Sequence, residues 1–163
     1  MKALFLDIDG VLNGHEKLES GYCGIRYECA KRLNRILDAV PDFQIVVSSA
    51  WRYMTYRGDM TIAGFEYLLL VHGIKAYQRV HGVTEADPVA AEPCHFDSET
   101  WKANGIRWRA DQIREYISQH GITCYVVIDD LPLEIERFVR TDGECGLTDD
   151  DANKVISFLK EPT

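Results

Sequence analysis

Three apolar stretches of strand length in this chain each end in acidic or hydroxyl side chains, and this pattern most constrains the fold. The stretches are KALFLDI at 2–8, FQIVVSS at 43–49 and CYVVIDD at 124–130. Runs rich in Val, Ile, Leu and Phe are typical of strands buried on both faces of a parallel sheet. Ligands bind at the carboxyl ends of such strands. The polar residues at these ends are therefore the candidates for function.

Segments whose apolar residues have helical spacing lie between the strand-like runs. A weaker run around 137–141 and a mixed segment at 73–84 are candidates for further strands. The helical segments are 27–40, 61–73, 109–121 and 146–159, with Gly73 and Gly121 as left-handed caps and Thr148 as an N-cap. Alternating strands and helices predict an α/β fold, a three-layer α/β/α sandwich with a mainly parallel, Rossmann-like sheet.

Length and composition predict one domain spanning residues 1–163. The chain is 46% hydrophobic, which suits one well-covered core. It has 26 acidic and 18 basic residues, and a net charge of −8 argues against broad nonspecific nucleic-acid binding. Five scattered cysteines without CxxC spacing indicate reduced thiols. Since no apolar run is long enough for a membrane span, we expect a cytoplasmic protein without membrane association.

The acidic strand ends predict a metal site. Asp7 and Asp9 are two residues apart, so their side chains point the same way in an extended strand. Asp129 and Asp130 would bring further carboxylates to the same edge of the sheet. Like charges at short range raise one another's pKa, and a bound cation relieves the conflict. Oxygen ligands without a histidine pattern favour Mg²⁺.

Basic and hydroxyl side chains near the same edge predict an anion. The helix at 109–121 is preceded by Arg107 and includes Arg109, and cations at a helix start are unfavourable unless an anion is held nearby. Ser48 is a candidate ligand for a phosphate oxygen. Arg52 lies just past the same strand end and is a second candidate for contact with a substrate phosphate.

Each of these features also has a plain structural interpretation. Acidic strand ends can turn into surface loops, and serines are ordinary where a strand ends. Trp51, Trp101 and Trp108 can stack on a base, but we favour a core role for two of the three. The acidic run 149–151 is interpreted as a charged helix start and not as a metal cluster.

The ordered set DIDGVLN, a strand ending SS, a basic residue opening a helix and a strand ending DD resembles the haloacid dehalogenase (HAD) superfamily, chiefly magnesium-dependent phosphatases. The stretches VVSSAWR, VVIDDLP and RTDGECGLT are similar to a compact subgroup that includes the HAD domains of Swiss-army-knife RNA repair proteins. The resemblance spans nearly the whole chain.

The resemblance implies a role for each residue of the first two motifs. Asp7 would be the nucleophile that forms an aspartyl-phosphate, and Asp9 the general acid and then the general base. Ser48 would match the phosphate-binding hydroxyl, with Ser49 as the alternative. An oxygen of Asp7 and the backbone carbonyl of Asp9 would complete the coordination of Mg²⁺.

The resemblance also assigns the later motifs. Arg109 would match the basic residue, usually lysine, because it stands four residues before Ile113, and Arg107 is the alternative. Asp130 would bind the metal directly. Asp129 would be either a ligand or a hydrogen-bonding partner of one.

These implications together predict a Mg²⁺-dependent phosphomonoester hydrolase. Only a short flap at about 13–27 and a loop or insert at about 84–105 stand where other members carry cap domains, so we expect a capless or minimally capped enzyme. An open site would admit a phosphorylated small molecule such as a nucleotide, or a nucleic-acid phosphate end. The alternatives are a noncatalytic phosphate- or partner-binding module and a receiver-like phosphoacceptor domain.

Overall fold

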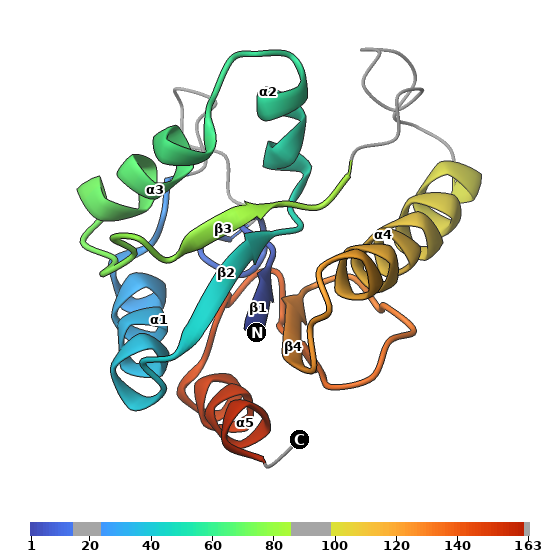
Figure 1. Cartoon of the computed structure of the whole chain (residues 1–163). Coiled ribbons are helices and arrows are strands. Elements are labelled where there is room, and N and C mark those ends of the chain that lie inside the picture. The colour runs from blue at the N-terminus through green and yellow to red at the C-terminus, as the bar shows by residue number, and fades with distance from the viewer. Residues whose placement is uncertain (15–23, 86–98, 162–163) are drawn as a thin grey trace.

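The computed structural model describes residues 1–14, 24–85 and 99–161, except for the side chains of 99–105. Its centre is a five-stranded parallel sheet with the order β3-β2-β1-β4-β5 (Figure 1). The strands are β1 (Lys2–Leu6), β2 (Phe43–Val47), β3 (Val80–Val83), β4 (Cys124–Asp129) and β5 (Phe138–Arg140). All five predicted strand regions therefore contain a strand, and the α/β fold class is confirmed.

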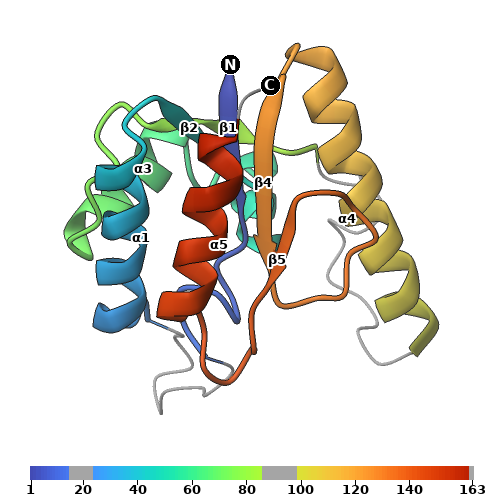
Figure 2. The same cartoon turned by 90° about the horizontal axis from the view of Figure 1, so that it is seen from below.

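Helices cover both faces of this sheet, as predicted. They are α1 (Tyr27–Ala39), α2 (Tyr53–Tyr56), α3 (Ile62–Val71), α4 (Glu99–Gln119) and α5 (Asp149–Lys160), with a 3₁₀ turn η1 (Ala50–Arg52). Helices α1, α3 and α5 pack on one face and α4 on the other (Figure 2). Among the described residues, no helix combines the length and apolar character needed to cross a membrane.

The central strand β1 divides its side chains between two apolar clusters. Leu4 and Leu6 pack with residues of α1, α3 and α5, whereas Phe5 packs with Ile113 of α4. This alternation follows from the two-residue period of a strand. It also decides on which face a residue just beyond the strand will lie.

The predicted helix ends at Gly73, Gly121 and Thr148 are confirmed. Both glycines follow a helix with positive φ, 78° and 57°. The Thr148 hydroxyl accepts a hydrogen bond from the Asp151 backbone N–H, and the Asp151 carboxylate accepts one from the Thr148 N–H, which completes a capping box.

The predicted start of α4 is wrong. The helix begins at Glu99, so Arg107 and Arg109 lie within it and not at its N-terminus. Ile106 and Ala110 continue the apolar spacing backwards from Ile113, which explains why the helix extends further. The dipole argument for an anion near the helix start is therefore lost. The end of the predicted loop at 84–105 is helical, while 86–98 and residues 15–23 of the predicted flap lie outside the described residues.

Candidate active site at the carboxyl ends of the strands

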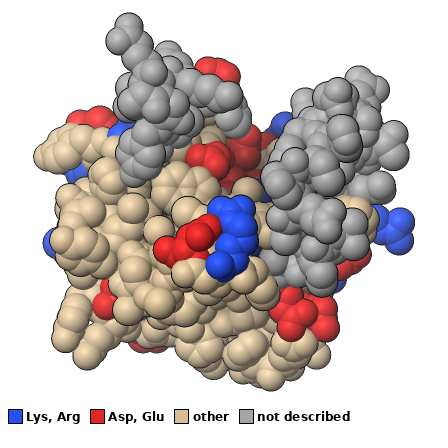
Figure 3. Space-filling model, turned by 90° about the horizontal axis from the view of Figure 1, so that it is seen from above, with Lys and Arg blue, Asp and Glu red and all other residues tan. Residues whose placement is uncertain are grey.

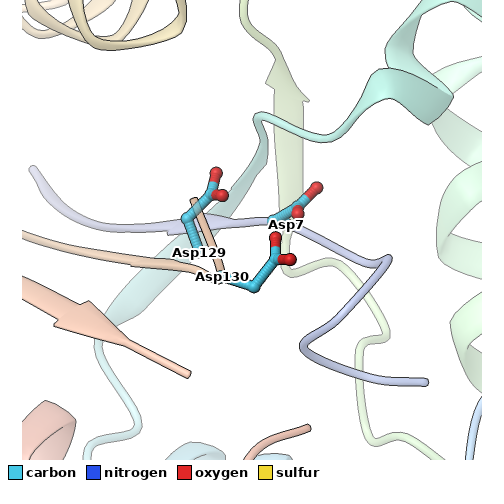
Figure 4. Close-up of side chains that lie close together, drawn as sticks. All are labelled: Asp7, Asp129 and Asp130. Carbon is cyan, nitrogen blue, oxygen red and sulfur yellow. The ribbon is translucent and has the colours of Figure 1, made fainter. Parts of the chain in front are cut away.

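Three carboxylates gather at the carboxyl ends of the two adjacent strands β1 and β4. Asp7 directly follows β1, Asp129 is the last residue of β4, and Asp130 follows it. One ligand oxygen from each lies within 4.8 Å of the others. Figure 4 shows these side chains projecting to the same side of the strand ends. The predicted meeting of these acids at one edge of the sheet is therefore confirmed.

Strand alternation places part of this site on the sheet face that α4 covers. The residues two positions before Asp7 and Asp129 pack in the α4 cluster, as does the residue two positions before Ser48. These three earlier residues are Phe5, Val127 and Val46. Asp7, Ser48 and Asp129 consequently continue the same face, toward α4.

Arg109 links the two buried carboxylates. Its Nη1 lies 2.7 Å from Asp129 Oδ2 and 3.3 Å from Asp7 Oδ2. Burial by itself lowers the pKa of the Arg109 guanidinium, but the two carboxylates outweigh burial and raise the pKa. Arg107 is exposed and lines a different pocket of about 500 Å³ with Asp111 and Arg114. Of the two candidate arginines, the structure brings only Arg109 to the acidic group.

Burial dominates the electrostatics of Asp7 and Asp129. Asp7 is 3% exposed and Asp129 is fully buried. Burial raises the pKa of Asp7 to about 7, with Arg109 and the Ser49 hydroxyl opposing the shift and the neighbouring carboxylates adding to it. Burial likewise raises the pKa of Asp129, and Arg109 opposes that shift. The single positive charge of Arg109 therefore does not fully offset the burial and mutual repulsion of these carboxylates.

Four buried side-chain oxygens have no hydrogen-bond partner among the described residues, and two of them belong to residues of this site. These two are Asp7 Oδ1 and Ser48 Oγ. Buried polar atoms in folded proteins are nearly always hydrogen-bonded, so each indicates room for a ligand. A carboxylate oxygen beside two further carboxylates fits a hard cation such as Mg²⁺, and a free hydroxyl fits a phosphate oxygen.

Gly10 makes the close approach of Asp130 possible. A Cβ on Gly10 would lie 2.6 Å from Asp130 Cγ, and the residue has a φ of +77° that other residues rarely adopt. The Thr141 hydroxyl donates to the Gly10 carbonyl at 2.8 Å. The glycine of the DIDG sequence is therefore required by the geometry of the site.

The Asp9 side chain stands apart from the three grouped carboxylates. Its Oδ1 accepts a 2.8 Å hydrogen bond from Asn13 Nδ2, and its Oδ2 accepts one of 2.8 Å from Trp51 Nε1. Among the described residues, the group that could hold a metal does not include this carboxylate. The predicted contribution of Asp9 to the metal site, through its backbone carbonyl, stays a prediction.

The two serines after β2 have different surroundings. Ser49 Oγ caps η1 by accepting from the Trp51 backbone N–H at 3.3 Å. Ser48 Oγ is the one left without a partner among the described residues. This difference favours Ser48 over Ser49 as the hydroxyl for a phosphate oxygen.

The side chain of Arg52 binds backbone carbonyls and a glutamine, and not the predicted substrate site. It is 4% exposed, and its Nη1 donates to the carbonyls of both Ser48 and Ser49 at 2.8 Å. Its Nη2 donates to Gln112 Oε1 at 2.9 Å, and its Nε to the Glu85 carbonyl at 3.3 Å. These bonds fix the turn after β2 instead of leaving the guanidinium for a substrate, so the predicted phosphate contact has no support here.

Sequence reasoning missed Asn13 and Trp51 as residues of the site. The spacing of Asn13, four residues after Asp9, was a usable signal because DIDGVLN includes both. The sequence indicates Trp51 only as a core residue or as a platform for stacking on a base. Its partly buried ring packs against the core, and its Nε1–H donates a hydrogen bond to Asp9 Oδ2.

A comparison with protein-family models matches residues 3–152 to the HAD domain in Swiss Army Knife RNA repair proteins. The chain belongs to this family. The predicted membership of the HAD superfamily is confirmed, and a phosphatase-like hydrolase is the activity this membership suggests for the HAD domain. No curated protein and no solved structure matched the chain in the corresponding comparisons.

Proposed function

We propose that this HAD domain is a Mg²⁺-dependent phosphomonoester hydrolase with Asp7 as its nucleophile. The observation that carries the proposal is the setting of Asp7. It is buried beside two further carboxylates and one arginine, and its Oδ1 lacks a partner among the described residues. A structural acid would be paired at both oxygens.

The residues around Asp7 would prepare it for attack on phosphorus. Arg109 favours the ionised form of Asp7 and lies 3.3 Å from its Oδ2, while Oδ1 has no partner among the described residues. Asp7, Asp130 and the backbone carbonyl of Asp9 would hold Mg²⁺, with Asp129 as a further ligand or as the partner of Arg109. When bound, Mg²⁺ would neutralise the charge that the carboxylates and the phosphate share.

Asp9 would move the proton in both halves of the reaction. In the first half, Asp7 forms a bond to phosphorus, the ester P–O bond breaks, and Asp9 gives its proton to the leaving oxygen. In the second half, Asp9 takes a proton from water, whose oxygen attacks phosphorus and releases Asp7 and inorganic phosphate. The Ser48 hydroxyl would donate a hydrogen bond to a phosphate oxygen during both steps and keep its proton.

The substrate we favour is a nucleotide or the phosphate end of an RNA. The description of the family supports RNA. Figure 3 shows basic side chains in small separate groups on the described part of one face, and the net charge is −8. These features are consistent with recognition of one phosphate end and not with broad binding along a nucleic acid.

The test is turnover of a panel of phosphomonoesters that includes nucleotides, sugar phosphates and RNA with 3′ or 5′ phosphate ends. We expect phosphate release with Mg²⁺, loss of release with EDTA, and a loss of at least about 10³-fold in Asp7→Asn, because the nucleophile is removed. Asp149→Asn, an exposed acid of α5, is the matched control and should keep wild-type turnover. Retained turnover in Asp7→Asn would contradict the mechanism. Tight binding of a phosphate analogue without turnover of any substrate would instead support the noncatalytic alternative.

A further inference from the structure

The carboxylate of Asp9 is fixed from two sides. Asn13 Nδ2 donates to one oxygen and Trp51 Nε1 to the other, each at 2.8 Å. Asn13 belongs to the same loop as Asp9 and also accepts from the Gly10 N–H at 2.9 Å. Trp51 comes from η1, after the neighbouring strand β2. The indole is therefore a link between the DIDG loop and a separate part of the fold.

Trp51 is itself held in place. Its backbone N–H donates to Ser49 Oγ, and its ring packs against the core cluster. Arg52 clamps the carbonyls of Ser48 and Ser49 with one nitrogen. The turn that presents the indole N–H is consequently tied to the end of β2, so the direction of that N–H is determined by the fold and not by solvent.

We infer that Trp51 is a positioning residue for the proton transfer by Asp9. This inference rests on the proposed function, in which Asp9 protonates the leaving oxygen. An indole N–H donates and never accepts, and the Asn13 amide presents an N–H as well. Each occupies a lone pair of the carboxylate, so the transferable proton of Asp9 is restricted to the remaining lone pairs. General acid catalysis depends on such an orientation toward the leaving oxygen.

The inference predicts a dependence on the leaving group that a merely structural tryptophan would not produce. A p-nitrophenolate leaves readily without protonation, whereas the alkoxide of an alkyl phosphate needs the proton from Asp9. Trp51→Phe keeps an aromatic ring and removes the N–H. We expect it to lower kcat/KM for glycerol 3-phosphate by roughly tenfold or more and for p-nitrophenyl phosphate by less than about threefold.

The experiment measures both kcat/KM values on the same preparation, so their ratio does not depend on the folded fraction. Trp108→Phe is the matched control, because Trp108 is 39% exposed on α4, and its ratio should equal that of the wild type. An unchanged ratio in Trp51→Phe, whether both values fall together or neither falls, overturns the inference. If wild type hydrolyses neither ester, nor any other phosphomonoester of the panel, the proposed function fails instead.

A measurement on Asp9→Asn covers the case in which Trp51→Phe does not fold. The chain has three tryptophans, each of which contributes one indole N–H signal to a proton–nitrogen correlation spectrum. A hydrogen bond to a carboxylate is stronger than one to an amide oxygen. Asp9→Asn should therefore shift one indole signal upfield and leave the other two in place. Three unshifted signals would overturn the inference.

Discussion

Two groups of three aspartates in this molecule have opposite surroundings. Asp149, Asp150 and Asp151 open α5, whereas Asp7, Asp129 and Asp130 meet at the ends of β1 and β4. In α5, Asp149 pairs with Arg32 and Arg35 of α1, and its side chain is 60% exposed. Asp151 completes the capping box with Thr148.

The acids of α5 are thus compensated by local partners, solvent and the helix dipole. The negative charges of the acids at the strand ends are only partly compensated. Asp7 and Asp129 are buried, share one nitrogen of Arg109, and leave Asp7 Oδ1 without a partner among the described residues. The number of acids in a group therefore says little about its function. Incomplete compensation of buried charge is the feature that indicates a ligand.

The largest expected contrast concerns the arginines of the two groups. Arg109→Met should destabilise the metal-free protein by about 3–5 kcal/mol at pH 7, because it leaves two buried carboxylates without their cation. Arg32→Met should cost less than about 1 kcal/mol, since its partner is exposed. Urea unfolding in EDTA measures both free energies. Equal effects of the two substitutions would contradict the distinction between the groups.

A smaller effect is expected from pH. The native pKa of Asp7 is about 7 and its ordinary value is 3.8, so between these values the native state holds a proton that the unfolded state has lost. Stability of the metal-free protein should therefore fall as pH rises through this window. The raised pKa of Asp129 acts in the same direction. We expect a decrease of at least about 1.4 kcal/mol between pH 5 and pH 8, the equivalent of one pKa unit.

Asp7→Asn should remove most of this decrease, whereas Asp149→Asn should retain it. Urea unfolding at several pH values in EDTA gives the comparison. Parallel pH profiles for wild type and Asp7→Asn would show that Asp7 is ionised normally in the metal-free protein. This result would contradict the claim that the two acidic groups differ in their electrostatics.

The parts of the site that could be predicted from the sequence depend on local periodicity. The apolar runs and their polar ends were sufficient to place Asp7 and Asp129 at one edge, because parallel strands bring their carboxyl ends together. The choice of Arg109 over Arg107 also follows from spacing. Arg109 lies four residues before the buried Ile113 and so shares its helix face, although the predicted start of that helix was wrong.

The parts that could not be predicted depend on the directions of long side chains. Arg52 was expected at a substrate phosphate because it follows β2, yet its guanidinium turns back to the carbonyls of that turn. Trp51 and Asp9 are 42 residues apart, and their hydrogen bond requires the 3₁₀ turn η1, which no periodic pattern indicated. Rotamers and short turns are set by tertiary packing, and a pattern of residue types does not contain them.

The smallest expected effect tests whether the two acidic groups are independent. Thr148→Ala removes the hydroxyl of the capping box and should destabilise the protein by about 1 kcal/mol without changing turnover. A backbone hydrogen bond of 2.8 Å from the Leu147 N–H to the Val11 carbonyl joins the start of α5 to the DIDG loop. If loosening the cap were transmitted through this bond, the orientation of Asp9 would change, and turnover of alkyl phosphates would fall more than that of aryl phosphates. Urea unfolding and the two kcat/KM values for Thr148→Ala therefore decide whether the capped helix only supports the fold or also helps to hold the catalytic loop.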